Sequence, residues 1–99
     1  MKILALEKEM PNTTPEQFAP YLKAEALRIW ELYQSGELRE FFFRGDRNEA
    51  ILMMECTDVE GARELLGTLP LIQAGLIDFE IIPLVPYPGF ERLFEEPSP

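Results

Sequence analysis

Few side chains in this sequence are suited to acid–base or nucleophilic chemistry. The chain has 99 residues, no histidine and one cysteine, Cys56. Without histidine, it lacks the commonest general base, the commonest zinc ligand and the usual proximal haem ligand. Cys56 has no imidazole to activate it, so we expect an inert buried thiol. The sequence also has no glycine-rich phosphate loop and no metal-ligand spacing. We therefore expect no metal site and no cofactor, and look first at the carboxylates.

One glutamate lies where a helix should be apolar. Drawn on a helical wheel, the segment after Pro15 has apolar side chains within about 120° of arc, namely Phe18, Leu22, Ala26, Ile29, Leu32 and Tyr33. Glu25 falls inside this arc. Burial of a carboxyl group disfavours its charged form, which suits a general acid or base. The alternatives are an ion pair with Arg28, Arg39 or Arg44, or a side chain that reaches out past the stripe.

The segment 37–44 supplies the other polar candidates. If it is a strand, its residues alternate between the two faces of a sheet, with Leu38, Glu40, Phe42 and Arg44 on one and Arg39, Phe41 and Phe43 on the other. Whichever face lines an apolar pocket would bring an arginine to it. One face brings Arg39, and the other brings Arg44 together with Glu40. A guanidinium there could hold a carboxylate or enolate oxygen through two hydrogen bonds. The alternative is a surface salt bridge, which the nearby turn favours for Glu40 and Arg44.

Proline, glycine and turn residues divide the chain into the elements that must position these groups. We expect strands at 2–9, 37–44, 50–56 and 76–84 and helices at 15–35 and 59–69. The first helix begins after Thr14, with Gln17 completing a capping box, and ends at Gly36. Pro20 predicts a kink or break near residues 17–19. Asp58 caps the second helix, which the sequence Leu69-Pro70-Leu71 should end.

The order βαββαβ predicts an α+β, ferredoxin-like fold. Two right-handed crossovers joined by a hairpin give a four-stranded antiparallel sheet with both helices on one face. We assign residues 1–85 to this domain. Residues 86–99 form a tail rich in proline and aromatic residues.

The expected strands are apolar on both faces. Phe41-Phe42-Phe43 and the run 51–54 place large side chains on both sides, and so does the last strand. Helices cover only one face, and an exposed second face would be a larger apolar patch than monomers usually carry. We therefore expect a second copy of the chain to cover it, as a dimeric α+β barrel. The tail would cross to the partner subunit, or, as the alternative, fold back over its own sheet.

The charge balance excludes several partners. With 18 acidic and 9 basic residues, the net charge is −9. Such a surface repels nucleic acid and anionic lipid. The sequence has no apolar run near the roughly 20 residues of a membrane span and no signal-peptide pattern. We expect a soluble, cytoplasmic protein.

Three segments resemble the muconolactone isomerase family. They are residues 25–32 with Gly36 and Leu38-Arg39, the Leu-Leu-Gly-Thr-Leu-Pro-Leu stretch at 65–71, and the strand at 77–81. The resemblance spans roughly residues 18–84. It implies a dimeric α+β barrel that can assemble into larger rings, and a cofactor-free isomerase that moves a double bond in an unsaturated lactone by proton transfer. Glu25 and Arg39 have counterparts in the family. A family histidine is replaced here by Glu40.

Three functions are compatible with these observations. In the first, a small unsaturated acid or lactone binds between the first helix and the sheet, Glu25 shuttles a proton and Arg39 stabilises the enolate. The residues expected to contact this substrate are Tyr21, Trp30, Glu40, Phe41, Phe43 and Arg44. The second is a non-catalytic binding or assembly module whose pocket is filled by Trp30, Phe41 and Phe43. The third is a cofactor-free monooxygenase. A cavity beside Glu25 would favour the enzyme.

Overall fold

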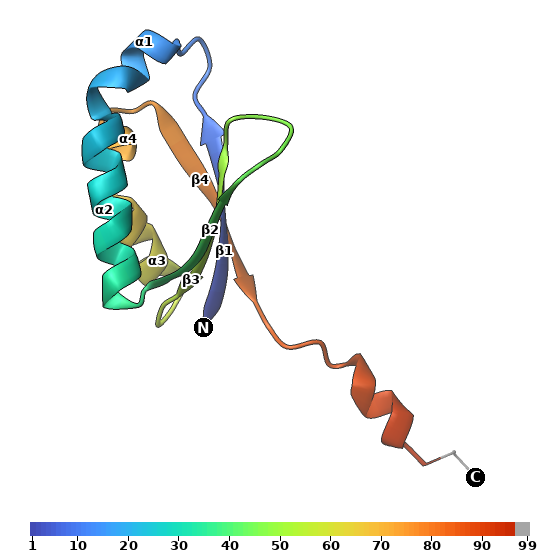
Figure 1. Ribbon diagram of the computed structural model, residues 1–99. Coiled ribbons are helices and arrows are strands. Elements are labelled where there is room, and N and C mark those ends of the chain that lie inside the picture. The colour runs from blue at the N-terminus through green and yellow to red at the C-terminus, as the bar shows by residue number, and fades with distance from the viewer. Residues whose placement is uncertain (97–99) are drawn as a thin grey trace.

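The computed structural model describes residues 1–96, which form a four-stranded sheet with helices against one face (Figure 1). The strands are β1 (Lys2–Glu9), β2 (Leu38–Phe43), β3 (Ala50–Glu55) and β4 (Ile77–Leu84). The helices are α1 (Pro15–Phe18), α2 (Leu22–Ser35), α3 (Val59–Leu66) and α4 (Pro70–Gln73), and two 3₁₀ segments are η1 (Ala19–Tyr21) and η2 (Gly89–Phe94). The sheet order is β2-β3-β1-β4 with every neighbouring pair antiparallel. This confirms the predicted α+β, ferredoxin-like fold.

The first helical segment is broken as Pro20 predicted. It is divided into α1, η1 and α2, because proline has no N–H to donate and its ring clashes with the preceding turn. At the start, the Thr14 N–H donates to Gln17 Oε1 at 2.8 Å, which is one half of the expected capping box. At the end, Gly36 adopts a left-handed φ of 87°, which glycine takes without steric cost.

The region after α3 differs from the sequence prediction. The helix ends at Leu66 instead of Leu69, and Pro70 begins the short helix α4 instead of terminating α3. A proline suits the first position of a helix, because its missing N–H would have no partner there and its φ is already helical. The extra turn places the backbone N–H of Leu71 at the start of α4, facing α2.

A β-bulge in β2 changes which residues share a face. Leu38 is opposite Met54 and Glu40 is opposite Met53, so one extra residue, Arg39, is inserted. The simple alternation predicted for this segment is therefore wrong across the bulge. Leu38 joins Phe41 and Phe43 on the helix-facing side, while Glu40 and Phe42 lie on the opposite side.

Both faces of the sheet carry apolar residues, as expected, and the face away from the helices also carries charged residues such as Lys8 and Glu80. The core lies between the sheet and the helices and is formed by buried side chains that include Ile3, Ala5, Leu32, Leu38, Leu52, Met54, Leu66 and Phe79. The other face carries partly or largely exposed apolar residues, namely Leu4, Leu6, Phe42, Ile51, Met53, Ile82 and Leu84. No helix of residues 1–96 covers this second face (Figure 1). We call it the outer face.

The tail leads away from the sheet after β4 and does not fold back over it (Figure 1). The described chain measures 67 × 29 × 21 Å along its principal axes as a result. Tyr87 and Phe90 contact each other, with ring centroids 5.1 Å apart, and both side chains are exposed. Residues 97–99, the last part of the tail assigned from the sequence, lie outside the described residues. None of the helices within 1–96 has the length and apolar character needed to cross a bilayer.

Candidate functional site

A cleft of about 550 Å³ lies between α2 and the helix-facing side of the sheet. Small-molecule sites in proteins typically measure roughly 300–1,000 Å³. Its lining is mostly apolar and comes from every layer of the fold, including Phe18, Ile29, Phe41, Leu52, Leu71 and Phe79. Three acidic side chains, Glu7, Glu9 and Glu25, also line it, together with the amide of Asn48. The cleft therefore has the size and composition of a ligand site.

The apolar stripe predicted on the first helix has two roles. In the last turn of α2, Leu32 is 2% exposed and belongs to the core. Nearer the start, Phe18, Leu22, Ala26 and Ile29 line the cleft, and Phe18 and Ile29 also pack against the core. The apolar stripe therefore contributes to the core and also forms one wall of the cleft.

Glu25 projects from this wall and is half-buried. Its Oε1 accepts a hydrogen bond of 2.9 Å from the backbone N–H of Leu71. Burial raises the pKa of Glu25, and the hydrogen bond from Leu71 opposes part of that rise. A half-buried carboxyl group held in one orientation beside a cleft can accept and return a proton.

The ion pair considered as an alternative for Glu25 does not form within residues 1–96. Arg28 donates to Thr68 Oγ1 at 2.8 Å and lies 3.4 Å from Glu31 Oε1. Arg39 Nε donates to the carbonyl oxygen of Gly36 at 2.6 Å. Arg44 makes two hydrogen bonds to the carboxylate of Asp46, at 2.8 and 2.6 Å. The partner of Glu25 is thus a backbone amide, which leaves its charge without a counterion.

Glu7 is a second carboxyl group of the cleft, and the sequence reasoning missed it. The pKa of Glu7 is raised to about 7, mainly by burial and in addition by the negative charges of Glu9, Glu25 and Glu49, while a hydrogen bond with the backbone of Ala50 acts in the opposite direction. The sequence did contain a signal. Alternation along β1 places Glu7 on the same face as Ile3 and Ala5, which are fully buried.

Glu7 and Glu25 reach the cleft from opposite sides, one from the sheet and one from α2. The charge of Glu25 contributes to the raised pKa of Glu7, whereas the pKa of Glu25 is raised by its own burial. When neighbouring carboxyl groups disfavour each other's ionisation, one can stay protonated while the other is charged. The pair can therefore supply one proton acceptor and one hydrogen-bond donor near neutral pH.

The aromatic residues predicted to contact a ligand divide between the cleft and the surface. Trp30, Phe41 and Phe43 line the cleft. Tyr33 lies between two of them, with ring centroids 5.8 Å from Trp30 and 5.4 Å from Phe41. These rings form part of the wall and leave the cleft open. Tyr21 lies in η1 and does not contribute to the lining.

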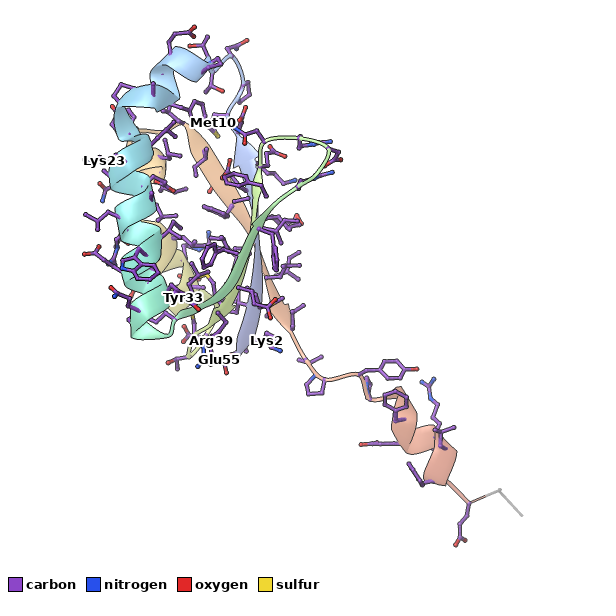
Figure 2. All side chains as sticks on the ribbon, in the orientation of Figure 1. Lys2, Met10, Lys23, Tyr33, Arg39 and Glu55 are labelled. Carbon is purple, nitrogen blue, oxygen red and sulfur yellow. The ribbon has the colours of Figure 1, made fainter. Side chains whose placement is uncertain are left out.

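The polar residues predicted for the site in the segment 37–44 do not line the cleft either. Arg39 lies at the end of the sheet that carries Lys2 and Glu55, opposite the end that carries Met10 (Figure 2). Glu40 is exposed on the outer face. Arg44 forms an ion pair with Asp46 at the surface, and a surface salt bridge was the alternative considered for Arg44. The positions of these three residues give no support to the roles expected from sequence. In the described part of the chain, no group of three or more His, Cys, Asp or Glu side chains is placed to hold a metal ion.

Comparisons with known proteins identify the fold. No family model and no curated protein sequence matches the chain. Among solved structures, it is similar to muconolactone isomerase, with a TM-score of 0.73 and 19% identity over 89% of this chain and 92% of that one. It is also similar to 5-chloro-2-hydroxyhydroquinone dehydrochlorinase (TftG) from Burkholderia phenoliruptrix AC1100, solved in complex with 2,5-dihydroxybenzoquinone. That match has a TM-score of 0.70 and 15% identity, and it covers 86% of this chain and 94% of the TftG chain. The chain therefore has the fold of muconolactone isomerase, as the sequence resemblance predicted.

Proposed function

We propose that this protein is a cofactor-free isomerase that moves a double bond in a small unsaturated acid or lactone by proton transfer. The observation that carries the proposal is the cleft of about 550 Å³ beside the half-buried Glu25. A closed apolar interior would have favoured a purely structural module. The similarity of the fold to a muconolactone isomerase supports the same reaction class.

In the proposed reaction, Glu25 acts as the base and then as the acid. Its carboxylate removes a proton from the carbon next to the substrate carbonyl, and the electron pair of that C–H bond forms a dienolate. Glu25 then returns the proton to the carbon at the far end of the dienolate, so the double bond moves and no atom is gained or lost. The hydrogen bond from Leu71 holds the carboxylate in place during both steps.

Glu7 takes the role of stabilising the dienolate oxygen. A pKa of about 7 leaves a large fraction of Glu7 protonated at neutral pH, and a protonated carboxyl group donates an O–H hydrogen bond. The sequence assigned this role to Arg39, whose Nε is instead bonded to Gly36 O outside the cleft lining. We therefore propose Glu25 and Glu7 as the catalytic pair.

The active form in this proposal is a homodimer in the cytoplasm. The apolar outer face supports sheet-to-sheet pairing, because exposed apolar patches of this kind mark interfaces. The tail, which leaves its own sheet, would then contact the partner subunit. Cys56 is a free thiol, which fits a reducing compartment.

A non-catalytic ligand-binding module is the second candidate. It is favoured by the hydrogen bond between Glu25 and Leu71, which already gives Glu25 a structural role in joining α2 to α4. Both candidates predict ligand binding in the cleft. Only the isomerase predicts exchange of carbon-bound hydrogen with solvent.

The test uses α-angelica lactone and its analogue in which a carboxymethyl group replaces the methyl group. Each is incubated with the protein in D₂O, and proton NMR follows both the migrated double bond and deuterium uptake. Catalysed migration of either lactone, lost in Glu25→Gln and kept in Glu16→Gln, supports the proposal. Glu16 is an exposed residue of α1 outside the cleft lining. Rates equal to those in buffer alone for both compounds would overturn the isomerase and leave the binding module.

A further inference from the structure

The charged side chains that line the cleft are all acidic. Glu7, Glu9 and Glu25 contribute carboxyl groups, and no lysine or arginine of residues 1–96 is part of the lining. Glu49 adds another carboxylate next to them, since the Glu9 N–H donates to its Oε2 at 3.0 Å. A ligand entering the cleft therefore meets several carboxyl groups.

The basic side chains of the surrounding elements are paired or face elsewhere. In the hairpin loop, Arg47 lies 3.5 Å from Glu49 and Arg44 pairs with Asp46. Lys23 lies on the side of α2 away from the sheet, and Lys2 and Arg39 lie at the end opposite Met10 (Figure 2). A ligand carboxylate would lose its hydration in the cleft and gain no counterion there.

The carboxyl groups of the cleft also favour hydrogen-bond donation over binding of a cation. Burial is the largest cause of the raised pKa of both Glu7 and Glu25, and with a pKa of about 7 a large fraction of Glu7 is protonated at neutral pH. A protonated carboxyl group offers an O–H to a ligand oxygen, whereas an ammonium group has no lone pair to accept it. The walls provided by Trp30, Phe41 and Phe43 suit an apolar ring.

We propose that the cleft selects uncharged ring compounds with a carbonyl oxygen, such as lactones and cyclic ketones, and rejects carboxylates. The carbonyl oxygen accepts a hydrogen bond from Glu7, and the ring lies between the aromatic wall and Ile29. This inference rests on the proposed function, because it assumes that the cleft beside Glu25 is the substrate site. It narrows the substrate from an acid or lactone to an uncharged compound.

The test compares three ligands with the same six-membered ring, namely cyclohexanone, cyclohexanecarboxylate and cyclohexylammonium. Trp30 is the single tryptophan of the chain and lines the cleft, so its fluorescence and its indole N–H signal in NMR report binding there. At about pH 6, where Glu7 is mostly protonated, cyclohexanone should bind tightest and the carboxylate about tenfold or more weaker.

The dependence on pH identifies the donor. Cyclohexanone should bind more weakly as the pH rises from about 6 to about 8.5, because Glu7 loses the proton that it donates. Glu9, Glu25 and Glu49 face Glu7 and favour its protonated form. The Glu7→Gln variant keeps an N–H donor at every pH and should bind the ketone without this pH dependence. Glu7→Met, which has no donor, should bind it weakly throughout, and Glu16→Gln should behave like the parent protein.

Three outcomes would overturn the inference. They are carboxylate binding equal to or tighter than ketone binding, tightest binding of the ammonium compound, and no binding of any of the three ligands. These outcomes are separate from a failure of the proposed function. A protein that prefers cyclohexanone but does not isomerise either lactone would keep the ligand class and lose the reaction. A protein that isomerises a lactone but binds the carboxylate best would keep the reaction and lose the ligand class.

Discussion

The backbone N–H of Leu71 donates a 2.9 Å hydrogen bond to Oε1 of Glu25, which connects α4 to α2 across 46 residues of sequence. The same carboxyl group lies in the lining of the cleft. Glu25 thus has a structural and a proposed chemical role, and substitutions must separate the two.

Glu25→Gln and Glu25→Ala should have different effects on stability and the same effect on catalysis. Glutamine keeps a carbonyl oxygen that can accept the N–H of Leu71, so we expect the free energy of unfolding to change by less than about 1 kcal/mol. Alanine leaves that N–H without its partner and should cost about 1–3 kcal/mol. Both variants should lose lactone isomerisation. Urea unfolding combined with the deuterium assay measures these effects, and full turnover in Glu25→Gln would remove Glu25 from the mechanism.

Glu7 should make the protein less stable as the pH rises toward neutrality. Its pKa is about 7 in the folded protein and near 4.5 in an unfolded chain, so the folded state binds more protons between these values. The stabilisation is fully present below about pH 4.5 and is lost as the pH rises through about 7. At about pH 8, Glu7→Gln should therefore be more stable than the parent protein by about 1–2 kcal/mol, allowing for partial exposure of the side chain.

Thermal or urea unfolding at several pH values tests this prediction. At about pH 4.5 the advantage of Glu7→Gln should vanish, since Glu7 is then protonated in the folded state and uncharged like glutamine. Glu16→Gln is the matched control for the general effect of removing one negative charge from a chain of net charge −9. An advantage of the same size in both variants would mean that overall charge, and not the environment of Glu7, is responsible.

Arg39 should be dispensable for isomerisation. Its Nε donates to Gly36 O at the C-terminal end of α2, and its side chain does not line the cleft. We expect Arg39→Gln to change the rate of lactone isomerisation by less than about threefold and to cost about 0.5–1.5 kcal/mol of stability through the lost hydrogen bond. A much larger loss of activity with an intact fold would restore the catalytic role that the family resemblance assigned to Arg39.

The order of elements, the break at Pro20 and the apolar character of both sheet faces could be predicted from the sequence, because they depend on local patterns. Proline geometry, the conformation of Gly36 and residue alternation act over a few positions. Glu25 could be singled out for the same reason, as a charged residue within an apolar helical stripe.

The contacts that complete the site could not be read from sequence patterns. The bulge at Arg39 depends on how β2 pairs with β3, and it moves every later residue of β2 to the other face. The partner of Glu25 is a backbone amide of α4, a short helix that begins at Pro70, where only the end of the preceding helix was predicted. Glu7 was accessible to the alternation argument, but only the fold places it across the cleft from Glu25.

Removal of the tail from residue 86 onward should leave the fold intact and weaken the proposed dimer. Within residues 1–96, no buried core residue lies beyond Phe79 and no residue packed against the core lies beyond Ile81, and Tyr87, Phe90 and Phe94 are exposed. We therefore expect the free energy of unfolding of the truncated chain to stay within about 0.5 kcal/mol when both proteins are compared as monomers. The dimer should dissociate at a higher concentration than that of the full chain, as measured by sizing with light scattering. An unchanged dissociation concentration would show that the tail does not contact the partner.

Phe42→Glu should convert the proposed dimer to a monomer. Phe42 is the second-last residue of β2 and lies opposite Ile51 on the outer face. It borders the cleft but does not belong to the buried core, and it is 61% exposed in the single chain, so glutamate there disturbs no core contact. In a sheet-to-sheet dimer the same position is desolvated, and a buried carboxylate without a partner costs several kcal/mol. Leu27→Glu is the matched control, because Leu27 is 59% exposed on α2 and lies outside both the cleft lining and the outer face. Light scattering should give a monomer for Phe42→Glu and a dimer for Leu27→Glu. If both variants remain dimeric, the outer face is not the interface, and the apolar residues that it exposes require another explanation.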